Sequence, residues 1–284
     1  MEEVTMDYRI IADSCLDLTP EMKEEWKIQI VPLILQVDGV DFIDDASFDQ
    51  KKFIKAVADF EGCPKSSCPS PEDYKKAFGE DESPAFCVTL SAELSGSYNS
   101  AVLGQRLVQE EFPNKKVHIF NSRSASAGET LIAMKVQELA ESGMDFEEVV
   151  EKTEEFIRHQ DTMFVLENLD TLRKNGRLSG MKATLVSVLN IKPVMMATPE
   201  GTIEQCSLGR GTKKALKKMV EEVGKKVSDM EQKIFAISHC NCPERAAFVQ
   251  EEVKRLYSFK KIVIADTAGV STMYANDGGI VISF

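Results

Sequence analysis

The segment from residue 85 to residue 108 constrains the fold more than any other part of the sequence. Residues 85–90 are apolar and predict a buried strand, and residues 101–108 predict a helix. The turn between them holds four serines, Ser95 included, and Gly96. Turns of this kind lie at the end of an open α/β sheet where ligands bind. Their hydroxyls and backbone N–H groups suit an anion, although serine at this place also fits a plain helix N-cap.

The same strand-turn-helix pattern recurs through the first half of the chain. Further strands are expected at residues 9–12, 28–37 and 116–120, and helices at residues 48–60, 130–140 and 146–158. Pro32 within the second of these strands indicates an edge or a bulge. Alternating strands and helices predict a mostly parallel sheet that is covered on both faces.

Two more serine-rich segments are expected near the same end of this sheet. Residues 121–128, which include Ser126, follow a strand and lead into a helix. Residues 64–71 contain three prolines, which we expect to exclude regular structure, so Ser66 and Ser67 would lie on a stiff loop. The convergence of several such turns favours a ligand site more strongly than any single turn.

The pattern changes near residue 162. Shorter strands follow, with paired and antiparallel character, together with helices and an apolar segment, residues 181–189, that fits a buried helix. We therefore predict two α/β domains, residues 1–161 with a mostly parallel sheet and residues 162–284 with a mixed sheet, and a ligand between them. Arg177 follows the change of pattern; it fits an anion-binding arginine in the cleft or a surface arginine in a turn.

The composition excludes several classes of partner. A net charge of −12 argues against nucleic acid and against an anionic membrane surface. No apolar run approaches the length of a membrane span. The seven scattered cysteines and the lack of a leader-like N-terminus indicate reduced thiols and a cytoplasmic location.

The motifs that would signal a metal, a nucleotide or a serine nucleophile are weak. His239, Cys240 and Cys242 supply at most three ligands, so no metal is expected. No G-x-G-x-x-G or P-loop pattern occurs, so no cofactor is expected. Ser95 lacks the glycine that precedes the serine of a nucleophile elbow, and the sequence holds three histidines.

Six short motifs, spread in order over most of the chain, together resemble the DegV family. Ser66 stands where the family usually has threonine. The matching residues are Asp13-Ser14, Val31-Pro32-Leu33, Ser66-Ser67-Cys68-Pro69-Ser70, Leu94-Ser95-Gly96-Ser97-Tyr98, Ser126-Ala127-Gly128 and Gly176-Arg177-Leu178-Ser179.

The resemblance implies two α/β domains with a long-chain fatty acid buried between them. It places the carboxylate-binding hydroxyls on Ser66 and Ser95. It also implies that the protein is not itself a catalyst and that it presents the carboxylate to a separate fatty acid kinase subunit. The predicted ligand-binding residues are Ser66, Ser67, Ser95, Gly96, Ser126, Arg177 and Met273.

The sequence departs from the family near the C-terminus. The family usually has a histidine followed by Gly-Pro-Gly, whereas this chain has residues 271–278 with Met273 and Tyr274. Methionine cannot donate a hydrogen bond to a carboxylate. This departure bears on the kinase partner more than on fatty acid binding. Tyr274 is a replacement donor.

Two other functions fit the same serines. The first is a hydrolase or transferase that acts on a small anionic substrate in an open, serine-lined cleft with a base near Ser95. The second is a shallow site for a small polar anion. A fatty-acid-binding protein instead requires an enclosed apolar tunnel behind Ser95.

Overall fold

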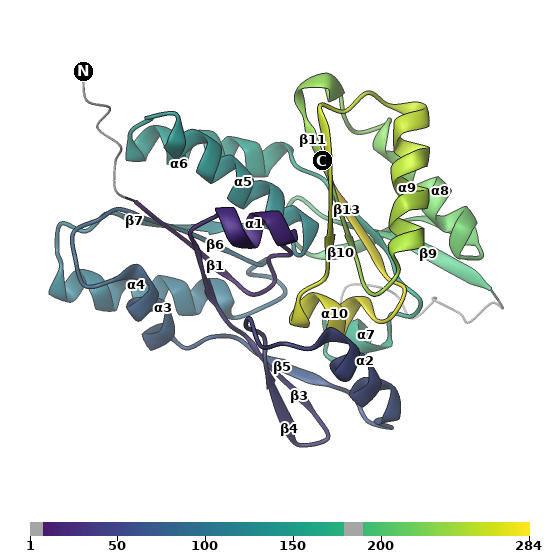
Figure 1. The fold of residues 1–284 in the computed structure, drawn as a ribbon, viewed down its shortest axis with the longest axis horizontal. Coiled ribbons are helices and arrows are strands. Elements are labelled where there is room, and N and C mark those ends of the chain that lie inside the picture. The colour runs from purple at the N-terminus through teal and green to yellow at the C-terminus, as the bar shows by residue number, and fades with distance from the viewer. Residues whose placement is uncertain (1–7, 179–189) are drawn as a thin grey trace.

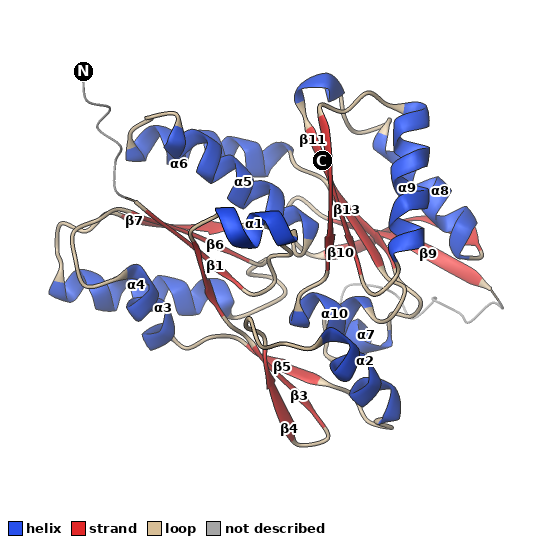
Figure 2. Cartoon of the chain, viewed as in Figure 1, coloured by secondary structure: helices blue, strands red, loops and turns tan. Residues whose placement is uncertain are grey.

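The computed structural model describes residues 8–178 and 190–284 of the chain. The helix expected at residues 181–189 lies outside the described residues. Within those ranges the strands form three sheets, with helices packed between and around them (Figures 1 and 2). No helix of the described ranges is long and apolar enough to cross a membrane.

The N-terminal half builds a four-stranded parallel sheet in the order β2-β1-β6-β7. Its strands are β1 (Arg9–Asp13), β2 (Ile28–Val31), β6 (Ala85–Thr89) and β7 (Val117–Asn121). Helices cover both faces, as the buried parallel strands require. One face packs on α3 (Pro71–Phe78) and α4 (Ser97–Glu111). The other packs on α1 (Pro20–Glu25), α5 (Ala127–Glu141) and α6 (Phe146–His159).

The alternation of side chains along β6 explains this covering. Phe86 and Val88 pack in the core beneath α5 and α6, whereas Ala85 and Cys87 pack against α3 and α4. Successive side chains of a strand point to opposite faces. All five residues of β6 are therefore buried.

The C-terminal half builds a six-stranded mixed sheet in the order β10-β9-β8-β13-β11-β12. The strands are β8 (Thr162–Val165), β9 (Ile191–Ala197), β10 (Ile203–Arg210), β11 (Ile234–His239), β12 (Lys261–Asp266) and β13 (Ile280–Ser283). β11 and β12 are parallel, and the other neighbouring pairs are antiparallel. Helices α8 (Thr212–Val223) and α9 (Pro243–Leu256) cover its outer face. The predicted fold class, two α/β domains with a parallel and a mixed sheet, is confirmed.

Helix α5 lies between these two sheets (Figure 1). Ile132 and Val136 pack toward the parallel sheet, and Ala127 and Leu131 pack against Val281 and the mixed sheet. Helix α5 is apolar around most of its circumference because it is buried on two sides.

A three-stranded antiparallel sheet, in the order β4-β3-β5, corrects two sequence predictions. Its strands are β3 (Ile34–Val37), β4 (Val40–Ile43) and β5 (Lys65–Ser67). Residues 28–37 are not one strand: β2 ends before Pro32, which lacks an N–H group, and β3 belongs to another sheet. Residues 64–71 are not wholly irregular, because the three residues of β5 lie between prolines and pair with β3 along one edge.

Three short helices lie where the three-stranded sheet meets the mixed sheet (Figure 1). They are α2 (Gln50–Asp59), α7 (Asp170–Lys174) and α10 (Gly269–Ala275). A 3₁₀ turn, η1 (Met230–Gln232), precedes β11. Helix α10 was not predicted from the sequence, and α4 begins at Ser97, four residues before the predicted start.

Candidate functional site

The turns that follow β1, β6 and β7 meet at one end of the parallel sheet. Asp13, at the end of β1, accepts hydrogen bonds from Leu90 N (2.9 Å) and Ser97 Oγ (2.6 Å). Ser91 N donates to the carbonyl oxygen of Ser124 at 2.8 Å. The predicted convergence of serine-rich turns is confirmed, but several of these serines bind the turns to one another rather than face open space.

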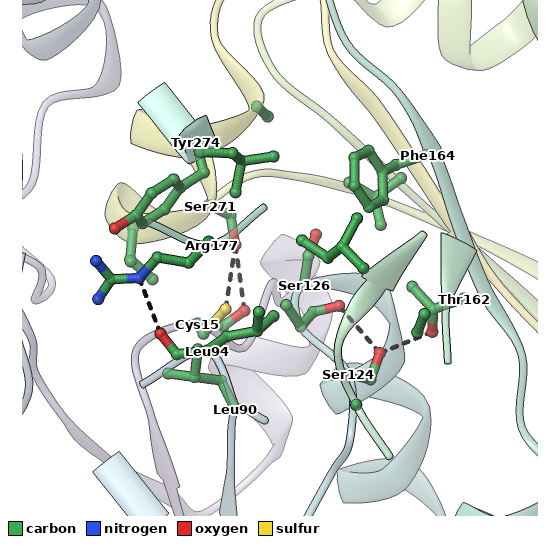
Figure 3. A pocket seen from close by; sticks show the side chains of 18 of the residues that line it. Cys15, Leu90, Leu94, Ser124, Ser126, Thr162, Phe164, Arg177, Ser271 and Tyr274 are labelled. Atoms are coloured by element: carbon green, nitrogen blue, oxygen red, sulfur yellow. Dashed lines mark hydrogen bonds between the residues drawn. The ribbon is translucent and has the colours of Figure 1, made fainter. Parts of the chain in front are cut away.

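A cavity lies between these turns, the mixed sheet and α10 (Figure 3). The parallel-sheet side contributes Cys15, Leu90 and Leu94, and the mixed sheet contributes Phe164 and Val281. Helix α10 closes a third side with Val270, Ser271, Tyr274 and Ala275. The lining is mainly apolar, which suits a hydrocarbon chain.

One end of this cavity carries polar groups. Arg177 donates from Nε to the carbonyl oxygen of Leu94 (3.0 Å) and from Nη1 to that of Asn175 (2.6 Å). Its guanidinium carbon lies 5.9 Å from the centre of the Tyr274 ring. The Tyr274 hydroxyl in turn lies 3.2 Å from Ser66 Oγ on β5. Within residues 8–178 and 190–284 no carboxylate lies within 4.0 Å of the Arg177 side chain, so its charge is available to an anion.

Ser66 and Ser67 differ in position although they are adjacent. Ser66 is half-buried and contacts Tyr274, whereas Ser67 is exposed. Neighbouring residues of a strand point to opposite faces, so only one of the two can face the cavity end. The prediction that both lie on an irregular loop is wrong, because both belong to β5, which turns their side chains to opposite faces.

Ser95 and Gly96 lie in the turn before α4. Ser95 is half-buried, and its Oγ accepts a hydrogen bond from Ser97 N at 3.2 Å. Gly96 is the N-cap residue of α4. A Cβ atom at Gly96 would lie 3.1 Å from Cys68 Sγ, so the missing side chain allows the turn to approach the β5–α3 segment.

Ser126 lines the cavity, but Met273 does not. The Ser126 hydroxyl donates to Asp17, and its backbone has a φ of 61°. Met273 is 1% exposed and packs in a core cluster with Leu33 and Phe53 beneath the three-stranded sheet. Its neighbour Tyr274 occupies the polar end of the cavity instead.

Buried aspartates hold the start of α10 in place. Both carboxylate oxygens of Asp44 accept backbone hydrogen bonds, from Gly269 N at 2.6 Å and from Val270 N at 2.7 Å. Asp17 accepts another from Ala268 N at 2.7 Å. Burial raises the pKa of Asp44 to about 6 and also raises the pKa of Asp17. Sequence reasoning missed both residues, because a buried aspartate has no pattern that separates it from a surface one.

The family model described as "Uncharacterised protein, DegV family" matches residues 7–284. The chain belongs to the DegV family. A DegV domain-containing protein of Streptococcus pneumoniae is 34% identical over 283 residues, which cover 98% of this chain and 99% of that protein.

Solved DegV structures share the fold. A DegV family protein from Ruminococcus gnavus, refined with vaccenic acid, is 52% identical with a TM-score of 0.95, covering 98% of this chain and 100% of that one. The Fak B3 protein of the Streptococcus pneumoniae fatty acid kinase, loaded with linoleic acid, is 33% identical with a TM-score of 0.90, covering 98% and 99%.

The candidate metal ligands His239, Cys240 and Cys242, and the histidines that could act as the base of a serine hydrolase, lie away from the cavity in the described part of this DegV chain. Cys240 and Cys242 are buried, and burial raises their pKa values to about 11 and 12. His239 Nδ1 lies 3.1 Å from Asp266 instead. Among the described residues no cluster of three or more His, Cys, Asp or Glu side chains is placed to hold a metal ion, and no histidine of those residues lines the cavity.

Proposed function

We propose that this protein binds a long-chain fatty acid, with the acyl chain in the cavity and the carboxylate at its polar end. The observation that carries the proposal is an apolar cavity that ends beside Arg177, whose guanidinium has no carboxylate partner among the described residues. The two solved relatives with bound vaccenic and linoleic acid support it. We place the boundary between the two domains between residues 161 and 162. The acyl chain of the fatty acid then lies between the two domains.

The proposed head-group site combines Arg177, Ser66, Tyr274 and Ser95. A guanidinium supplies charge, and hydroxyls supply donors that a carboxylate accepts. Each hydrogen bond to a charged group contributes roughly 1.5–3 kcal/mol. Gly96 serves this site by keeping the turn close to β5, and Ser126 serves it by shaping the wall.

The acyl chain supplies most of the binding free energy in this proposal. Burying a methylene group contributes about 0.8 kcal/mol, so a dozen methylenes contribute on the order of 10 kcal/mol. The head group therefore fixes the direction of the ligand, and the cavity length selects the ligand.

We further propose that the protein presents the carboxylate to a separate kinase subunit and does not catalyse the reaction itself. The likeness to Fak B3 supports a kinase partner. By the resemblance, Met273 stands where the family usually carries a histidine, and the neighbouring Tyr274 offers a neutral phenol instead, so this partner must accept a head-group site without an imidazole. The free thiols of all seven cysteines fit a cytosolic protein.

The test is native mass spectrometry of the protein purified from a bacterial host, followed by denaturing extraction of the bound lipid. We expect one long-chain fatty acid per protein. Arg177→Gln should retain less acid than the wild type, and Ser67→Ala, which alters an exposed side chain, should retain the same amount. An empty protein that also takes up no added oleate or palmitate contradicts the proposal.

A further inference from the structure

The far end of the acyl cavity is a thin wall that separates it from a second cavity. Arg177 and Tyr274 lie at one end of the acyl cavity, and Ser124 and Thr162 lie at the other (Figure 3). The second cavity opens on the other side of the same wall, so four residues line both. These are Arg123, Ser124, Thr162 and Ala197.

The second cavity differs in character from the first. Charged and polar side chains line part of it, among them Arg158, His159, Asp161 and Lys226, and apolar side chains, among them Ile157, Met196 and Pro199, line the rest. Lys226 pairs with Asp161 at 3.0 Å. A methyl terminus that entered this space would gain less than it gains in the acyl cavity, because charged groups that hold water replace part of the apolar lining.

Hydrogen bonds seal the wall from within. Ser124 Oγ lies 2.7 Å from Thr162 Oγ1, which lies 3.0 Å from Ser283 Oγ. Ser283 Oγ donates to the carbonyl oxygen of Asp161 at 2.8 Å, so the hydroxyls form a directed chain that ends on the backbone. The wall hydroxyls bind one another and are not free to bind a ligand.

Glycine residues allow the wall to close. A Cβ atom on Gly128 would lie 1.9 Å from Ser124 Oγ and 2.8 Å from Thr162 Oγ1, so a larger residue would displace both. The turn between β9 and β10 is fixed by Ser91 Oγ, which donates to the carbonyl oxygen of Gly201 at 2.7 Å. Gly201 has a φ of +95°, and a Cβ there would lie 2.4 Å from Ser91 Oγ.

We propose that Ser124, Thr162 and Ala197 form an end wall that sets the longest acyl chain this protein holds in full. This inference rests on the proposed fatty acid binding and assigns its length limit to named residues. A chain that reaches the wall is fully buried. Further methylenes have no apolar space to enter unless the wall opens into the second cavity.

The experiment measures dissociation constants of delipidated protein for saturated fatty acids of 12 to about 22 carbons. For wild type, affinity should rise about fourfold per methylene until the chain reaches the wall, and then stop rising. Thr162→Ala removes part of the wall and should move this break to longer acids by about two carbons. Thr162→Val restores the volume and should restore the wild-type break.

Ala197→Phe tests the wall in the opposite direction. A phenyl ring at this position fills the cavity end and should move the break to shorter acids. Thr198→Ala is the control, because Thr198 lines the second cavity alone. A break at the wild-type length in both Thr162→Ala and Ala197→Phe overturns the end wall while leaving fatty acid binding intact. If wild-type protein binds none of the acids, the proposed function fails and this inference fails with it.

Discussion

Glu129, in the first turn of α5, is a carboxyl group in an environment that disfavours its charge. It is fully buried, and neither carboxyl oxygen has a hydrogen-bond partner among the described residues. Burial, together with the negative charges of Asp13 and Asp17, raises its pKa well above the usual value. We infer that Glu129 is neutral in the folded protein, and folding at neutral pH therefore requires proton uptake.

Glu129→Gln should therefore raise the free energy of unfolding near pH 7, by about 1–3 kcal/mol. In the wild type, the contribution of Glu129 to the free energy of unfolding is fully present below about pH 4 and is lost as the pH rises through the raised pKa. The glutamine variant does not titrate and so does not lose this stability. Chemical denaturation between pH 5 and pH 8 measures the difference. Glu138→Gln, on the exposed side of the same helix, is the control and should change stability by less than about 0.5 kcal/mol. A variant less stable than wild type at every pH would contradict a neutral Glu129.

Tyr274 is the second residue whose chemistry can be tested by a single substitution. Tyr274→Phe removes a hydroxyl that contacts Ser66 and keeps the ring beside Arg177. Loss of one hydrogen bond to the charged carboxylate should weaken fatty acid binding about ten- to a hundredfold. Isothermal titration of delipidated protein measures this change, with Tyr98→Phe, which lies outside the cavity, as the control. Equal affinities for wild type and Tyr274→Phe would remove Tyr274 from the head-group site.

At the scale of elements, α10 is the part of the site that depends most on contacts distant in sequence. It has seven residues and no side-chain cap of its own. Such a helix is marginal alone. Asp44, which follows β4, and Asp17, which follows β1, supply acceptors for its first N–H groups. Helix α10, which carries Tyr274, is thus positioned by carboxylates from the other half of the chain.

Asp44→Asn tests this support through its pH dependence. Because the pKa of Asp44 is raised from its usual value of 3.8 to about 6, its stabilising contribution is complete below about pH 4 and is lost as the pH rises to about 6. The stability of wild type relative to Asp44→Asn should fall over that window by about 2–3 kcal/mol. Comparing both proteins by urea denaturation cancels the other buried acids, which titrate in each. A constant difference from pH 4 to pH 7 would rule out this titration.

At the scale of the whole molecule, the two sheets share one helix and one cavity. Helix α5 packs against both sheets, and the cavity takes lining residues from both halves of the chain. A ligand in that cavity therefore contacts both domains. Its binding should stabilise them together rather than one at a time.

Fatty acid binding should raise the melting temperature of a single transition. At a ligand concentration of 100 times Kd the gain is about 2.7 kcal/mol, or about 5 °C for a chain of this size. Differential scanning calorimetry with and without palmitate measures the shift. Octanoate at the same concentration is the control, because its short chain buries too little surface. Two separate transitions, with one shifted, would show that the ligand binds a single domain.

The sequence alone determined the alternation of strands and helices, the parallel and mixed sheets, and the serine-rich turns at one sheet end. These follow from local patterns: apolar runs predict buried strands, and serine and proline mark helix starts, as at Ser70 and Pro71. The motifs also identified Ser66, Ser95 and Arg177 as candidate site residues.

Tertiary structure decided that Arg177 lines the cavity and that Ser66 and Ser95 lie outside its lining. Ser66 and Ser67 lie in a three-residue strand that exists because β3 pairs with it, so their side chains point to opposite faces. Met273, which was expected at the site, packs in the core and Tyr274 lines the cavity, because α10, held by Asp17 and Asp44, turns one side chain into the core and the other to the cavity. The end wall likewise joins Ser124 to Thr162, which are 38 residues apart in the chain. Such positions depend on long-range pairing and burial, and a local sequence pattern carries neither.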